Sequence, residues 1–155
     1  MTTSETAQIE RLLTRLLGGL GHGGIRVSDE GTLGLRYDDR FDLCLEVDED
    51  TGTLHVFADL ANATVPEQAD FLAQLLSANV AETGEARFAL DPTSDRVLYC
   101  YAHAASDLDE IGLQTILENF LADCLTWQER LREMSASGDE AAGRKPPLTS
   151  KFIRA

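Results

Sequence analysis

The stretch RFDLCLEVDEDTGTLHVFADLA, residues 40–61, contains two runs in which apolar and polar residues alternate. Alternation with a period of two is typical of strands that bury one face. In the first run that face carries Phe41, Leu43, Leu45 and Val47, and in the second Leu54, Val56, Ala58 and Leu60. The acidic turn DEDTG at 48–52 contains a glycine, so the stretch predicts a β-hairpin.

Strand patterns also occur on both sides of this hairpin. Upstream, Leu33, Leu35 and Tyr37 alternate with polar residues. Downstream, ARFAL (86–90) and RVLYCYAHA (96–104) flank the turn residues DPTSD, which predicts a second hairpin.

Three segments have helical spacing. The first carries a leucine-rich stripe formed by Ile9, Leu12, Leu13, Leu16, Leu17 and Leu20. The second is predicted over 66–83, after a capping box at 64–67, with a core stripe of Leu72, Leu75, Leu76 and Val80. The last is predicted from an N-cap at Ser106 to about Met134.

The predicted order is therefore αβββαββα, which is not a strict alternation of strands and helices. It favours an α+β fold with a twisted antiparallel sheet packed by helices. Beyond residue 134 the chain is rich in Ser, Gly, Pro and basic residues. We expect one domain over 1–134 and a disordered, basic tail over 135–155.

The net charge of the chain limits the classes of partner that it can bind. Its 155 residues contain 27 acidic and 13 basic side chains, a net charge of -14, which disfavours binding to nucleic acid or to anionic lipid. An acidic surface also suits a protein that must carry apolar surface without aggregating. The sequence has no secretory signal and no apolar run as long as a membrane span, so we expect a cytoplasmic protein.

Candidate catalytic groups are sparse. Cys100 and His103 are an odd number of residues apart in a predicted strand, so their side chains should point to opposite faces. The three cysteines fit neither a disulfide framework nor a zinc pair, and we expect no metal and no cofactor. A binding protein rather than an enzyme is predicted, and a cysteine enzyme using Cys100 or Cys44 is the alternative from another class.

The segment FLAQLLSANVAETGEARFALDPTSDRVLYCYAHAASDLDEIGLQTILENFLADCLTWQERL, residues 71–131, resembles the class I type III secretion chaperones, the Tir-chaperone-like family. With the element order and the acidic charge, the resemblance extends over about 7–134. It implies a bacterial homodimer that binds the N-terminal segment of a secreted effector in extended form. The chaperone would keep this segment competent for secretion and target it to the apparatus, whose ATPase is a further candidate partner. A protein of this fold that sequesters a transcription factor or secretion component is the alternative.

The resemblance also implies which residues meet partners. The cargo groove would be formed by Leu13, Leu17, Val27, Leu35, Phe41 and Leu43. The dimer interface would be formed by Leu76, Phe88, Leu90, Tyr99 and Tyr101. The long basic tail and the glycine-rich GGLGHGG at 18–24 depart from the family pattern.

Overall fold

The computed structural model describes residues 4–18, 26–27, 32–37, 40–62 and 69–141. Its elements are, in chain order, α1 (Glu5–Gly18), β1 (Arg26–Val27), β2 (Thr32–Tyr37), β3 (Phe41–Asp48), β4 (Thr53–Asn62), α2 (Ala69–Ala81), β5 (Arg87–Asp91), β6 (Arg96–Ala104), the 3-10 turn η2 (Ala105–Asp107) and α3 (Glu110–Ala141). The α+β prediction is confirmed, and the structure adds the two-residue strand β1 to the predicted order.

One antiparallel sheet holds the six strands of the described residues, in the order β1-β2-β3-β4-β6-β5. Both predicted hairpins are present, β3–β4 and β5–β6. Gly52, which ends the first turn, has a φ of 66°, a left-handed conformation that glycine adopts without steric cost. Among the described strands, β1 and β5 lie at the two ends of the sheet.

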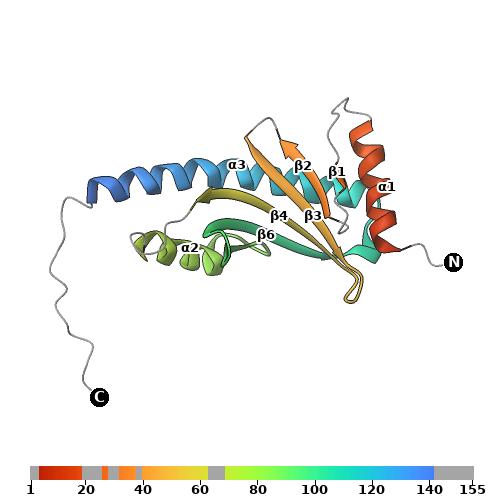
Figure 1. Cartoon of the computed structure of the whole chain (residues 1–155), viewed down its shortest axis with the longest axis horizontal. Helices are drawn as coiled ribbons and strands as arrows, with labels where there is room; N and C mark the ends of the chain where they lie inside the picture. Colours follow the sequence, from red (N-terminus) through yellow and green to blue (C-terminus); the bar gives the residue numbers. More distant parts are fainter. Residues whose placement is uncertain (1–3, 19–25, 28–31, 38–39, 63–68, 142–155) are drawn as a thin grey trace, which may run out of the picture.

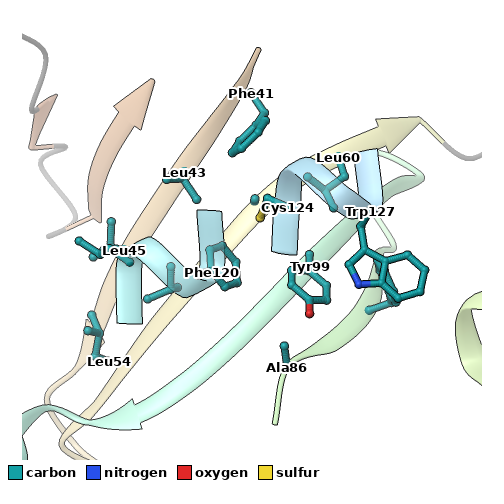
Figure 2. Close-up of a cluster of buried hydrophobic side chains, with 14 of the residues drawn as sticks. Phe41, Leu43, Leu45, Leu54, Leu60, Ala86, Tyr99, Phe120, Cys124 and Trp127 are labelled. Atoms are coloured by element: carbon teal, nitrogen blue, oxygen red, sulfur yellow. The ribbon is translucent and has the colours of Figure 1, made fainter. Parts of the chain in front are cut away.

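The hydrophobic core lies between one face of the sheet and the long helix α3 (Figures 1 and 2). Alternate residues of the strands, such as Leu45, Val56 and Tyr99, are buried there with the α3 side chains of Phe120 and Cys124. The α1 side chains of Ile9 and Leu13 complete the same cluster at the β2–β3 end of the sheet. The period-two pattern of residues 40–61 therefore predicts the buried face of β3 and β4 correctly.

The boundaries of α3 differ from the prediction. The helix begins at Glu110, because the backbone N–H of Gly112 donates to Asp109 Oδ1 at 2.7 Å. The predicted N-cap at Ser106 is wrong, since that residue lies in η2. The helix also continues past the predicted end at Met134 as far as Ala141, because no proline interrupts its backbone hydrogen bonding where the apolar stripe stops. Residues 142–155 of the predicted tail lie outside the described residues.

The second helix also differs in detail. It is described from Ala69, so the predicted capping box at 64–67 falls outside the described residues. Its buried side carries Phe71, Leu75 and Ala78. The predicted core stripe is wrong in two positions, because Leu76 and Val80 are exposed. Across the described part of the chain, none of the helices is both long and apolar enough to span a membrane.

Candidate functional site

The face of the sheet opposite α1 and α3, here called the open face, has an apolar centre. The strand registers place Cys44, Phe57 and Cys100 side by side in one row across β3, β4 and β6. Each of these three side chains is half-buried rather than buried. The centre of the sheet thus offers apolar surface on the side that the core does not use.

A shallow pocket lies on the open face beside the β3–β4 hairpin. Its volume is about 620 Å³. It is lined by Glu46, Val47, Asp48, Glu49, Asp50, His55, Phe57 and Cys100. This hairpin pocket combines an apolar floor with four carboxylates, a combination that suits a cationic segment with a large apolar side chain.

The cysteines of the open face lack the features of a nucleophile. Burial, followed by the charges of nearby acidic residues, raises the pKa of the Cys44 thiol, and burial raises that of Cys100. A raised pKa keeps a thiol protonated at neutral pH, whereas the thiolate is the reactive form. His103 pairs with Leu54 and contacts the hydroxyl of Tyr101 at 3.2 Å. Cys100 lies on the other face, so the predicted separation of Cys100 from His103 is confirmed.

A second apolar surface lies on α2. Ala69, Ala73, Leu76 and Val80 are all exposed, and the exposed fractions of the last two are 67% and 91%. Their spacing of four, three and four residues is that of the a and d positions of a heptad, so they share one side of the helix. This α2 seam has the pattern of a helix that packs against another helix. The helical spacing of Val80 is visible in the sequence, but this spacing does not show whether its side of the helix is buried. The sequence analysis therefore assigned Val80 to the core.

The outer edge of β5 is closed by a side chain from α2. The amide of Asn79 donates to the backbone carbonyl of Phe88 at 3.1 Å, and its Oδ1 accepts from the Phe88 N–H at 2.6 Å. Thr83 Oγ1 donates to the carbonyl of Ala86 at 2.8 Å. Asn79 therefore takes the place of a neighbouring strand, which protects an otherwise open sheet edge. The sequence reasoning did not identify this residue.

Replacing Asn79 by alanine should lower the free energy of unfolding by about 1–3 kcal/mol, because the Phe88 N–H loses its partner. It should also uncover the β5 edge and promote self-association at high concentration. Urea unfolding and light scattering test both effects. The control is Ser77→Ala, because the Ser77 hydroxyl donates within the helix, to the carbonyl of Ala73. Equal stability of the two variants would contradict the edge role of Asn79.

The first helix is held at its N-terminus by the β3–β4 turn. Glu49 Oε1 accepts hydrogen bonds from the backbone N–H of Thr6, at 2.9 Å, and from the Thr6 hydroxyl. Because Thr6 lies in the first turn of α1, Glu49 satisfies an N–H that has no partner within the helix. These bonds hold the pKa of Glu49 below its ordinary value of 4.5. The hairpin thereby fixes the position of α1 on the sheet.

This contact should make stability depend on pH. A lowered pKa in the folded state means that the contribution of Glu49 is present above about pH 4.5 and is lost as the pH falls through the folded value. We expect Glu49→Gln to melt at a lower temperature than the native chain at pH 7. The gap should close as the pH falls through the lowered folded-state pKa of Glu49. Asp50→Asn in the same turn is the control, and a gap that is constant with pH would refute the assignment.

The predicted cargo-binding residues fall into three groups. Leu13, Phe41 and Leu43 are buried in the core of the single chain. Leu35 is half-buried on β2. The side chains of Leu17 and Val27 lie outside the described residues. The half-buried apolar residues at this end of the sheet are Leu12, Leu16 and Leu35, which pack against the core cluster.

The predicted dimer residues divide in the same way. Phe88 and Tyr99 are buried within the single chain, and Tyr101 is half-buried. Leu76 and Leu90 have exposed fractions of 67% and 37%. The exposed members, together with Val80, lie at the α2–β5 end of the sheet.

Comparison with known families gives one match that covers most of the chain. Residues 11–128 match the Tir chaperone protein (CesT) family. No curated protein is similar enough in sequence to count as a match.

Several solved structures share the fold. The structure of the ExsC-ExsE complex aligns with a TM-score of 0.71 and 24% identity, covering 83% of this chain and 97% of that one. The HopA1-SchA chaperone-effector complex aligns with a TM-score of 0.64 and 20% identity, covering 86% and 99%. The ExoU-SpcU complex from the type III secretion system of Pseudomonas aeruginosa aligns with a TM-score of 0.54 and 21% identity, covering 81% and 96%.

Proposed function

This chain belongs to the Tir chaperone protein (CesT) family, and we propose that it is a cytoplasmic chaperone for a type III secreted effector. It binds an extended N-terminal segment of the effector and keeps that segment competent for secretion. The observation that carries the proposal is the family match over 11–128, on a fold whose exposed features are apolar surfaces and a strand edge. Binding, rather than catalysis, is the proposed activity.

The edge of β2 is the best place for an extended cargo segment. Within the described residues, the short strand β1 pairs with Leu33 and Gly34, and Leu35 follows directly after them on β2. At the other end of the sheet, Asn79 closes the β5 edge. A cargo strand added to β2 would gain main-chain hydrogen bonds and place its side chains near Leu35, a recurring mode of peptide recognition.

The α2 seam supports a homodimer. An exposed helix face made only of Ala, Leu and Val is costly for an isolated chain, because its apolar surface stays in water. The small side chains of Ala69 and Ala73 allow a second helix to approach closely. A copy of the same helix presents the same heptad pattern, so the seam is self-complementary about a two-fold axis.

The proposal is tested by co-expression with the N-terminal ~100 residues of a secreted effector encoded beside this protein, a length that allows for the large surface such segments order on binding. Size-exclusion chromatography with light scattering should show a dimer that carries the effector segment. A chain that binds none of the neighbouring effectors under these conditions would overturn the proposal.

Leu35→Glu should weaken cargo binding at least about 10-fold, a loss of about 1.4 kcal/mol, because it places a charge beside the added strand. Fluorescence anisotropy of the labelled effector segment measures the affinity. Ala89→Glu, an exposed position on β5, is the control and should bind normally. Thermal unfolding verifies that both variants are folded, and equal affinities would place the cargo elsewhere.

A further inference from the structure

The hairpin pocket is shaped by side chains of the open face. Five of its lining residues belong to that face by their register: Glu46, Asp48, His55, Phe57 and Cys100. Both rings come from β4, whereas the open-face side chains of β6 become smaller toward the hairpin, from Leu98 and Cys100 to Ala102 and Ala104. Ala102 pairs with His55 and is exposed. This gradient in side-chain size leaves space above β6 beside the rings of β4.

The pocket also carries three carboxylates that form no ion pair among the described residues. They belong to Glu46, Asp48 and Asp50, whereas the fourth carboxylate of the lining, from Glu49, is bound to Thr6. The ion pairs of the described residues lie elsewhere: Arg36–Asp42, Arg96–Asp59, Arg130–Glu82 and Arg132–Glu129. Negative charge beside an apolar floor attracts a partner that is both cationic and apolar.

The effector segment that adds to β2 can also reach this pocket. Neighbouring strands lie about 4.8 Å apart, so a strand added beside β2 is about 19 Å from β6 across the sheet. Roughly six extended residues cover that distance. The β3–β4 hairpin lies at the end of the sheet away from α2 (Figure 1). A dimer formed through the α2 seam therefore leaves the pocket uncovered.

We propose that the hairpin pocket is a second contact site for the effector, and that it receives a large apolar side chain next to a lysine or arginine. The apolar side chain lies over Phe57 and Cys100, in the space above Ala102, and the cation lies at Glu46 and Asp50. This inference rests on the proposed chaperone function and adds the chemistry of the segment that the chaperone selects. Main-chain hydrogen bonds at β2 accept many sequences, whereas a pocket discriminates between side chains.

Thiol labelling of the full chain, with and without the co-expressed effector segment, tests the site. Cys100 lines the pocket, Cys44 lies on the same face nearer β2, and Cys124 is buried in the core. Mass spectrometry measures the labelling rate at each cysteine. We expect the bound segment to slow labelling of Cys100 several-fold and to leave Cys124 unchanged. Protection of Cys44 alone, a Cys100 rate equal to that of the free chain, or equal slowing of Cys124 would overturn the pocket assignment.

Ala102→Glu tests the space above β6. The larger, charged side chain fills that space and should weaken effector binding at least several-fold, as measured by fluorescence anisotropy. Ala89→Glu is the matched control, because Ala89 is an exposed alanine on the open face of β5 that does not line the pocket. Both variants add the same charge to the same face, and thermal unfolding verifies that both are folded. Equal affinities of the two variants would contradict the proposed site.

Glu46→Gln/Asp50→Asn tests the cation. The variant keeps Asp48, whose Oδ1 accepts from the backbone N–H of Asp50 in the turn. We expect several-fold weaker binding of the effector segment at low salt, and a difference that disappears at high salt, because the groups lie at the surface. Glu118→Gln/Glu119→Gln, at two exposed positions of α3, removes the same charge elsewhere and should bind normally. Equal affinities of the two double variants at low salt would refute a cationic partner.

The pocket site and the chaperone function fail separately. An effector segment that binds but leaves Cys100 unprotected contradicts the pocket site and leaves the chaperone function standing. If no neighbouring effector segment binds the chain, the chaperone function is overturned and the pocket site with it.

Discussion

Tyr99→Ala should lower the free energy of unfolding by about 3–5 kcal/mol, as large-to-small changes of buried aromatic residues do. The side chain is completely buried. Its ring lies 4.9 Å from that of Phe88 and 5.4 Å from that of Phe120, and Phe88 in turn packs edge-on against Trp127 at 4.7 Å. Removing the ring opens a cavity in the middle of this aromatic chain (Figure 2). Since domains of this kind are stable by only about 5–15 kcal/mol, a large part of the stability is lost.

The comparison with Tyr99→Phe makes the test specific. The Tyr99 hydroxyl lies 3.4 Å from Asp123 Oδ2, which is a long contact. Removing the hydroxyl should therefore lower the free energy of unfolding far less than removing the ring. Urea unfolding followed by Trp127 fluorescence measures both variants. The family resemblance assigns Tyr99 to the dimer interface, which predicts another outcome: a Tyr99→Ala chain of native stability that no longer dimerises. That result would contradict the core role.

The double variant Leu76→Asp/Val80→Asp should convert the proposed dimer into a monomer. An unpaired charge buried at an interface costs about 3–5 kcal/mol, so the dissociation constant should rise by at least about 100-fold. The stability of the single chain should change little, because both positions are exposed within it. Light scattering over a concentration series measures the change in mass.

Ile111→Asp is the matched control for this variant. Ile111 is also an exposed apolar residue, with an exposed fraction of 75%, but it lies in the first turn of α3. That end of α3 is near α1, away from α2 (Figure 1). We expect the control to remain a dimer. If Leu76→Asp/Val80→Asp stays dimeric as well, the seam is not the interface, and the open face becomes the next surface to test.

Much of the architecture could be predicted from local patterns. Alternation in residues 40–61 identifies the buried face of β3 and β4, because a strand has only two faces and one must leave water. The turn residues at 48–52 and 91–95 predict the positions of both hairpins. The family resemblance is confirmed by the match over 11–128. The placement of Cys100 and His103 on opposite faces of β6 is also a local property, because it follows from their odd spacing in one strand.

Helix faces and ends were less predictable. In α2, apolar residues surround most of the helix, so periodicity could not tell the side that meets the core from the side left open. Only the packing of Phe71, Leu75 and Ala78 against the body shows that Leu76 and Val80 face away. Likewise, Ser106 and Asp109 are both good N-caps, and the η2 turn selects Asp109.

The sequence by itself determined the alternation, the turns and the excess of acid, because each depends on residues close together in the chain. The tertiary structure alone decided the features that join distant segments. These are the closure of β5 by Asn79, the bonds between Glu49 and Thr6, and the meeting of Phe57 with Cys100 in the hairpin pocket. Such contacts depend on how the strands and helices pack, and no local pattern carries that information.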